Sequence, residues 1–260
     1  KEGYSWVVDA DIKSYFDTIP HPQLMERIEK KVADGRVLEL LKAFLKQGIM
    51  EGMKHWKPTE GTPQGAVISP LLANIYLDPL DWKMIREGFE MVRYCDDLVI
   101  LCRSQQQAQQ ALENLRQWLK EQGLSLNDEK TRIVDATQQG GFDFLGYHFE
   151  RGYRWPRPKS MQKLKDKIRV QTRLCNGRSL DEIIKFINPV LRGWFGYFKH
   201  SRWTTFQPLD GWIRMRLRSI LRKRSKRQGR GRGWDHQRWP NAFFKEGGLF
   251  SLHTAYASLC

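Results

Sequence analysis

The pattern of apolar residues in this 260-residue chain changes near Gly152. Before that point, short apolar segments with strand spacing alternate with segments of helical spacing. After it, each long apolar pattern has the helical period. The first pattern is typical of an antiparallel sheet with helices packed on one face, and the second of helices alone. We therefore predict an α+β domain over residues 1–152, an α-helical domain over 153–227, and a basic, aromatic C-terminal segment over 228–260.

Individual elements can be predicted from the same patterns. We expect strands at residues 6–12 and 131–134, and hairpins at 90–102 and 142–153. Helices are expected at 22–32, 37–47 and 105–122, and another begins at Ser69, with its continuation past Pro79 left open. Residues 155–158 look like a linker, helices follow at 159–174, 180–198 and 208–227, and 228–233 look like a flexible basic spacer.

Charge is distributed very unevenly along the chain. Residues 1–150 hold 18 Lys/Arg and 23 Asp/Glu, whereas residues 151–260 hold 26 and 6. This asymmetry predicts a polyanionic partner held mainly by the C-terminal part, although ribosome or membrane-surface binding would give the same signal. No stretch of about 18 uncharged apolar residues and no signal-peptide pattern occurs, so we expect a cytoplasmic protein that does not span a membrane.

The four cysteines show no paired CxxC spacing. Neither a zinc site nor a disulfide framework is therefore expected, and the thiols are interpreted as buried or incidental.

Three acidic residues lie on predicted strands rather than on a solvated helix face. Asp11 ends the first strand, and Asp96 and Asp97 lie near the turn of the 90–102 hairpin. If these strands are neighbours, the three carboxylates could hold two Mg²⁺ ions about 3.5–4 Å apart, as nucleotidyl transfer requires. The alternative is that they are ordinary turn-favouring aspartates.

Five motifs occur in a fixed order along the α+β part. They are Asp11-Ile-Lys-Ser-Tyr-Phe-Asp17, Gly61-Thr-Pro-Gln-Gly through Asn74, Tyr94-Cys-Asp-Asp97, Gly123-Leu-Ser-Leu-Asn-Asp-Glu-Lys130 and Phe144-Leu-Gly-Tyr147. Together they resemble the palm motifs of reverse transcriptases encoded by bacterial group II introns. Asn188-Pro-Val-Leu-Arg-Gly-Trp194-Phe-Gly-Tyr197-Phe resembles the maturase-specific thumb of the same family, also called domain X.

The resemblance implies an RNA-directed DNA polymerase that copies an RNA template from a DNA primer with dNTPs. Asp11, Asp96 and Asp97 would hold the two Mg²⁺ ions, with the backbone carbonyl of Ile12 as a further ligand. Cys95 occupies the variable position of the Tyr-x-Asp-Asp motif, where a small residue is usual.

Further roles follow from the same resemblance, each with an ordinary alternative. Phe16 would exclude a ribose 2′-hydroxyl and so select dNTPs, or it is a core residue. Gln64 and Gly65 would lie beside the templating base pair, and Lys130 would approach the nucleotide phosphates unless it is a solvated surface lysine. The primer-grip hairpin would contain Phe144, Leu145 and Gly146, or these residues are simply core.

A dense run of cations lies in the C-terminal part, with tryptophans nearby. We expect it to bind phosphates of the template and of the group II intron RNA, through Arg214, Arg218, Arg222, Lys223, Arg224, Lys226 and Arg227. The tryptophans Trp203, Trp212, Trp234 and Trp239 are interpreted as core rather than as stacking platforms. The spacing of Trp194, Tyr197 and Phe198 also favours core.

Members of the family carry a fingers region ahead of the strand at Trp6. Since this sequence begins close to that strand, the resemblance implies that the fingers come from another segment or chain. No zinc-stabilised endonuclease pattern follows the thumb. Two alternatives therefore stay open: an RNA-binding splicing maturase without autonomous polymerase activity, and a domesticated reverse transcriptase in defence or repair.

Overall fold

The computed structural model describes residues 3–46, 49–51, 54–56, 60–62, 66–174, 177–227, 229 and 233–259. The chain divides into two compact units, Lys1–Phe144 (unit 1) and Leu145–Cys260 (unit 2). Their helices and antiparallel strands confirm the predicted α+β class. No helix in the described ranges is long and apolar enough to cross a membrane.

Unit 1 is built on a four-stranded antiparallel sheet of order β4-β5-β1-β6. The central strands are β1 (Trp6–Asp11) and β5 (Asp97–Cys102), and the outer strands are β4 (Glu90–Tyr94) and β6 (Arg132–Asp135). Val8, Leu98 and Ile100 on the central strands are fully buried. By contrast, residues of β4 alternate between exposed and half-buried, as expected for an edge strand.

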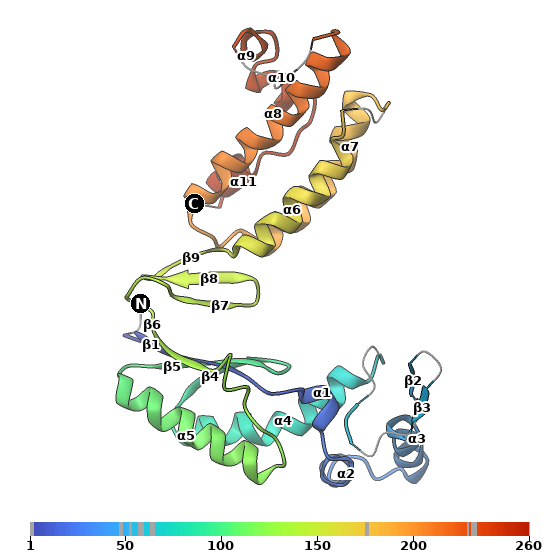
Figure 1. Ribbon diagram of the computed structural model, residues 1–260, viewed down its shortest axis with the longest axis vertical. Helices are drawn as coiled ribbons and strands as arrows, with labels where there is room; N and C mark the ends of the chain where they lie inside the picture. Colours follow the sequence, from blue (N-terminus) through green and yellow to red (C-terminus); the bar gives the residue numbers. More distant parts are fainter. Residues whose placement is uncertain are drawn as a thin grey trace. The chain divides into compact units, whose positions relative to one another are not determined.

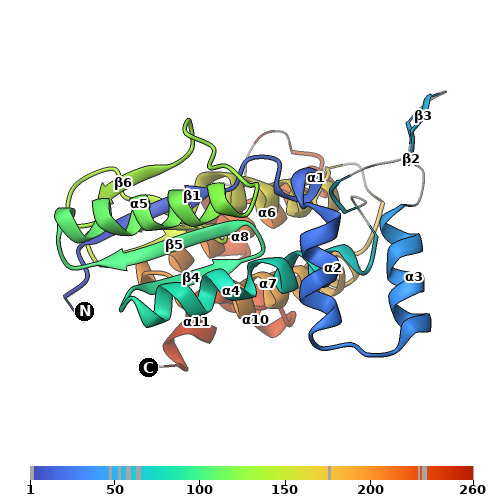
Figure 2. The ribbon, with the colours of Figure 1, turned by 90° about the horizontal axis from the view of Figure 1, so that it is seen from below.

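Two long helices, α4 (Ser69–Arg86) and α5 (Gln105–Glu121), cover one face of this sheet (Figures 1 and 2). The helix α4 begins with Pro70 in its first turn and continues through Pro79. The Ser104 hydroxyl caps α5 by accepting from the Gln107 backbone N–H at 3.1 Å. Leu72, Tyr76, Leu115 and the sheet residues share one core.

The other elements of unit 1 precede α4 or follow β6. They are α1 (Tyr15–Thr18), α2 (His21–Glu29), α3 (Gly35–Leu45), β2 (Ile49–Glu51), β3 (Lys54–Trp56) and β7 (Phe142–Phe144). The predicted helices at 22–32 and 37–47 match α2 and α3 with ends shifted by one to three residues. The β2–β3 hairpin was not predicted.

Unit 2 starts with two strands and continues as helices. Its elements are β8 (Tyr147–Glu150), β9 (Tyr153–Pro156), α6 (Pro158–Gln171), α7 (Leu180–Phe198), η1 (Trp203–Thr205), α8 (Phe206–Arg224), α9 (Trp234–Arg238), α10 (Asn241–Glu246) and α11 (Leu252–Ala257). The linker expected at 155–158 is wrong, because β9 pairs with β8 through Pro156 and α6 begins at Pro158. Proline at the first helical position needs no N–H partner.

Polar side chains tie the C-terminal residues of unit 2 to its long helices. The Asn188 amide donates to the Gly248 carbonyl at 2.8 Å, and its oxygen accepts from the Phe250 N–H at 2.9 Å. The buried Asp210 carboxylate accepts from the Ser251 hydroxyl at 2.7 Å and from two backbone N–H groups that begin α11. Residues 233–259 therefore pack as part of unit 2 rather than as a separate tail.

The aromatic residues of unit 2 do not all lie in its core. Trp239 and Phe198 are buried, and Trp194 and Trp212 are partly buried against the core, as predicted. The core prediction is wrong for Tyr197, Trp203 and Trp234, which are 53%, 54% and 79% exposed.

Candidate active site

The register of the central strands places Asp11 directly opposite Asp97. Tyr94 pairs with Asp97 across β4 and β5, so Cys95 and Asp96 form the two-residue turn of this hairpin. Cys95 has φ 57° whereas Asp96 has no positive φ, the pattern of a type II′ turn in which glycine is usual at the first position. The structure thus places the backbone positions of the three predicted aspartates at the same end of the sheet.

Arg93 of β4 links this turn to the helix α4, a role that was not predicted. Its guanidinium is bidentate to the Asp81 carboxylate of α4, with Nε to Oδ1 at 2.8 Å. Its remaining nitrogen donates to the Cys95 carbonyl at 2.9 Å and to the Asn74 amide oxygen at 3.0 Å. Burial alone would lower the pKa of Arg93, but the hydrogen bonds and charge of Asp81 outweigh it and raise that pKa.

Lys130 lies at the same end of the sheet. Its ammonium donates to Asp11 Oδ2 at 2.9 Å, and the Asn127 backbone N–H donates to the Asp11 carbonyl at 2.8 Å. The hydrogen bond with Asp11, its charge, and the charges of Asp96 and Asp97 raise the pKa of Lys130. Lys130 therefore forms an ion pair with one of the three aspartates, and its role near nucleotide phosphates stays a prediction.

The acidic group fits Mg²⁺ in its chemistry, since hard carboxylate oxygens are the ligands that this ion prefers. Asp11 and Asp97 also face each other by register. However, no three acidic, histidine or cysteine side chains among the described residues converge closely enough to hold a metal ion. Instead, the Asp11 carboxylate forms an ion pair with the ammonium of Lys130.

Phe16, the predicted sugar-selecting residue, lies on α1 and packs partly against the core. Its carbonyl accepts from the Thr62 N–H at 2.6 Å, and the Ile19 carbonyl accepts from the Gly61 N–H at 2.8 Å. Gly61 has φ 82°, and a Cβ there would lie 2.7 Å from the Asp17 carbonyl oxygen, so only glycine permits this approach. Gln64 and Gly65 lie outside the described residues.

The predicted primer-grip residues span the division between the units: Phe144 ends unit 1, whereas Leu145 and Gly146 begin unit 2. Leu145 has φ 47° and Gly146 has φ 81°. The Leu145 carbonyl accepts from the Tyr197 hydroxyl at 2.6 Å, and the Gly146 carbonyl accepts from the Ser160 hydroxyl at 3.0 Å. Within unit 2, the first two residues are therefore held by α6 and α7.

The predicted cationic cluster splits into two groups. Arg214, Arg218 and Arg222 recur every four residues on α8. Arg218 is buried and donates to the Trp239 carbonyl at 2.9 Å and to Asn241 at 2.8 Å, and Arg222 pairs with the buried Asp235 at 2.5 Å. The assignment of Arg218 as a nucleic-acid contact is corrected accordingly, because its buried guanidinium serves internal packing. Arg222 is partly exposed beside its ion pair, and its contact with nucleic acid stays a prediction.

The Nε of Arg214 is also buried, without a hydrogen-bond partner among the described residues. The exposed members of the cluster lie at and beyond the C-terminal end of α8: Lys223, Arg224, Lys226 and Arg227.

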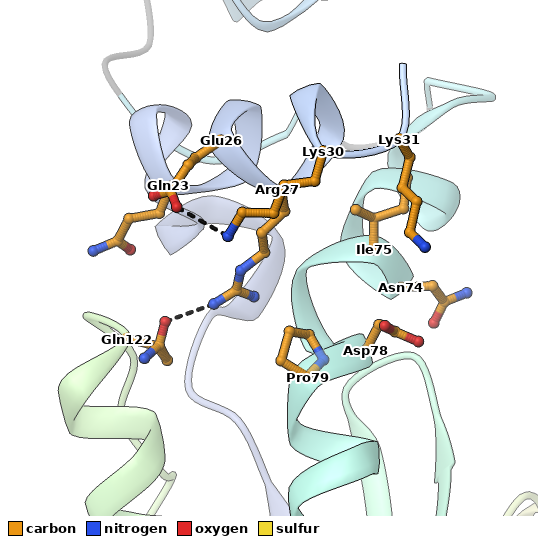
Figure 3. A pocket seen from close by; sticks show the side chains of 10 residues that line it. All are labelled: Gln23, Glu26, Arg27, Lys30, Lys31, Asn74, Ile75, Asp78, Pro79 and Gln122. Atoms are coloured by element: carbon orange, nitrogen blue, oxygen red, sulfur yellow. Dashed lines mark hydrogen bonds and ion pairs between the residues drawn. The ribbon is translucent and has the colours of Figure 1, made fainter. Parts of the chain in front are cut away.

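A pocket of about 650 Å³ lies between α2, α4 and the end of α5 (Figure 3). Arg27 stacks 4.0 Å from the centre of the Tyr76 ring and donates to the Gln122 amide oxygen at 2.6 Å. Asn74 both lines this pocket and accepts from Arg93, so one wall of the pocket belongs to the support of the turn. Its lining mixes lysines with carboxylates and selects no single class of ligand.

Comparison with known proteins identifies two family matches along the chain. Residues 1–149 match the family described as reverse transcriptase (RNA-dependent DNA polymerase), and residues 161–239 match the group II intron maturase-specific domain. Protein YkfC of Escherichia coli is 30% identical over 181 residues, which is 56% of this chain and 47% of YkfC. The group II intron-encoded protein LtrA of Lactococcus lactis is 47% identical over 79 residues, 30% of this chain and 13% of LtrA.

The chain therefore spans less than half the length of these curated relatives. Among solved structures, apo telomerase from Candida tropicalis aligns with a TM-score of 0.56 at 14% identity, covering 92% of this chain and 43% of the telomerase chain. At that identity, the likeness concerns the fold alone.

Proposed function

This chain belongs to the reverse transcriptase family and carries a group II intron maturase-specific domain, and from that membership we propose that it copies RNA into DNA. The observation that carries the proposal is the pairing of Asp11 with Asp97 across β1 and β5, next to the Asp96 turn and Lys130. In the proposed reaction, the primer 3′-hydroxyl attacks the α-phosphorus of a dNTP and pyrophosphate leaves.

Each residue at this end of the sheet has a proposed task. Asp11, Asp96 and Asp97, with the Ile12 carbonyl, would hold Mg²⁺. When bound, these ions would activate the primer hydroxyl and neutralise the developing phosphate charge. Asp11 would have to release Lys130, whose ammonium is then free to approach the nucleotide phosphates. Phe16 would close the sugar side of the site, and Arg93 would keep the turn in place.

The test is primer extension on an annealed RNA template with dNTPs and Mg²⁺. Asp97→Asn keeps the size of the side chain but removes one carboxylate charge, and should lower extension by about 10³-fold or more. Glu113→Gln removes an acid from the exposed face of α5 and should extend like the parent chain. If the parent chain binds RNA but does not extend, polymerase activity of this chain is refuted.

A second function is favoured by the match of residues 161–239 to the maturase-specific domain. We propose that unit 2 binds intron RNA and assists its folding for splicing. Splicing assistance should survive Asp96→Ala/Asp97→Ala, whereas DNA synthesis should not, because RNA binding by unit 2 does not involve these carboxylates.

A further inference from the structure

Three cations from the helices α6 and α8 gather around one indole ring on unit 2. Trp212 lies on α8, and Arg216 follows it one turn later on the same helix. Lys165 Nζ, Arg169 Cζ and Arg216 Cζ lie 5.9, 5.7 and 5.5 Å from the centre of the Trp212 ring. Lys165 and Arg169 are also one turn apart, on α6. Two helices thus present a mixed cationic and aromatic face.

This arrangement is built into the fold rather than spread over a solvated surface. Arg216 Nε donates to the Thr172 hydroxyl oxygen at 2.6 Å, and a second guanidinium nitrogen donates to the Thr172 carbonyl at 3.0 Å. Thr172 is 1% exposed, and its own hydroxyl donates to the Ile168 carbonyl at 2.7 Å. The guanidinium of Arg216 is therefore held in one position at the end of α6.

Negative charge does not balance these cations. Among the residues that the structure describes, the carboxylate paired with the group is Asp166, which accepts from Arg169 at 2.6 Å. Burial, and then the positive charge of Arg169, lower the pKa of Arg216, so the cations repel one another. Such a group is stabilised by an anion that supplies several acceptor oxygens.

A pocket of about 480 Å³ opens at the same place. Its lining includes Arg169, Thr172, Leu174, Trp212, Met215 and Arg216, and so combines two guanidiniums with apolar and aromatic surface. A phosphate with its ribose and one base fits the size range of ligand pockets of this kind. Guanidiniums bind phosphate oxygens in pairs, and an indole ring offers a surface for an unpaired base.

We propose that the pocket lined by Arg169, Trp212 and Arg216 binds a phosphate of single-stranded RNA, with the attached nucleotide lying against Trp212. Lys165, which lies beside the same indole ring, adds a further positive charge next to this pocket. The inference rests on the proposed RNA binding of unit 2 and gives it a location. That location differs from the cationic run at the end of α8, because the pocket is formed between α6 and α8.

The experiment measures the affinity of the whole chain for a labelled single-stranded RNA by fluorescence anisotropy, over 50–200 mM salt. The pocket variant is Lys165→Gln/Arg169→Gln. The matched control is Lys185→Gln/Lys245→Gln, which removes two exposed cations of unit 2 that are neither in the pocket lining nor among the three cations around Trp212. The single variant Arg169→Lys tests whether a positive charge at this position is enough for RNA binding, without the planar guanidinium.

We expect the pocket variant to bind about tenfold more weakly than the control at 100 mM salt. The slope of log affinity against log salt should be smaller by about 0.7, which is the contribution of one phosphate contact on a single strand. Arg169→Lys should keep the slope. Melting temperatures of the pocket and control variants should agree within about 2 °C, because all four substituted side chains are at least partly exposed.

Equal affinity and equal slope for the pocket variant and the control would overturn the pocket while leaving RNA binding by unit 2 intact. Failure of the parent chain to bind RNA would instead overturn the proposed RNA-binding function itself, and the pocket with it.

Discussion

The two units place their charged residues in different ways. In unit 1, strand register sets the site: once β1 and β5 pair, Asp11 must face Asp97. In unit 2, a helix distributes its cations around its circumference, so neighbours in sequence meet different surroundings. Arg218 is buried, Arg216 lines a pocket, and Arg224 is exposed, all on α8. Position in the sequence therefore indicates function more directly on a paired strand than on a helix whose packing partners are unknown.

Among the changes outside the three aspartates, the largest effect should come from breaking the support of the turn in unit 1. Arg93→Gln with Asp81→Asn removes both partners of the bidentate pair, so that no unpaired charge remains in the partly buried site. We expect the rate of nucleotide addition to fall about 10²-fold through misplacement of Asp96, because small displacements of catalytic groups are costly. Steady-state kinetics should show the loss in kcat, with RNA binding by unit 2 unchanged.

Arg86→Gln, which removes an exposed arginine of α4, is the control for this experiment. A normal kcat in the Arg93/Asp81 variant would show that the turn keeps its shape without its anchor.

The contrast within the cationic run can be tested by comparing Arg218→Met with Arg227→Gln. The first leaves the Trp239 carbonyl without its donor and should lower the free energy of unfolding by about 1–3 kcal/mol. The second changes an exposed side chain and should alter stability by less than about 0.5 kcal/mol. Urea denaturation measures both, and equal stabilities would contradict the packing role of Arg218.

A smaller effect should appear in alkali. Burial raises the pKa of the Cys102 thiol on β5 from 9.0 to about 11. Between these values, the unfolded chain loses the thiol proton while the folded chain keeps it, so folding binds a proton and stability falls as pH rises. The free energy of unfolding should be lower by about 2 kcal/mol at pH 11 because of this thiol.

Cys102→Ala should remove this part of the pH dependence, whatever it does to stability at neutral pH. Urea denaturation at pH 8, 9, 10 and 11 gives the free energy of unfolding of the parent and of the variant, and the difference between the two slopes against pH is the contribution of the thiol. Parallel curves would mean that the thiol ionises equally well in the folded chain.

Much of the sheet could be predicted because its strands carry short apolar patterns, and because the two central strands have aspartates at the ends that meet. The position of Asp11 beside Asp96 and Asp97 then follows from antiparallel pairing. The anchor formed by Arg93, Asp81 and Asn74 could not be predicted in this way. Its geometry depends on how α4 is rotated over the sheet, and the sequence spacing of these residues does not specify that rotation.

The internal role of Arg218 was missed for a related reason. The helices α9 and α10, which supply its partners, have five and six residues. A helix that short does not show a recognisable period, so residues 233–259 looked like a tail. The every-fourth-residue spacing of Arg214, Arg218 and Arg222 was visible in the sequence, and it indicates a single face that another element could cover.

The hydrogen bonds of Asn188 and Asp210 with residues 248–253 also affect the order in which the protein folds during synthesis. The sheet of unit 1 has all four of its strands once residue 135 has left the ribosome. In unit 2, by contrast, α7 and α8 are synthesised well before residues 248–253, which bond to Asn188 and Asp210. The Asp210 carboxylate can accept from the N–H groups of residues 252 and 253 only after these have been added. We expect unit 1 to mature on the ribosome, whereas unit 2 completes its core only after more than a hundred further residues have been added.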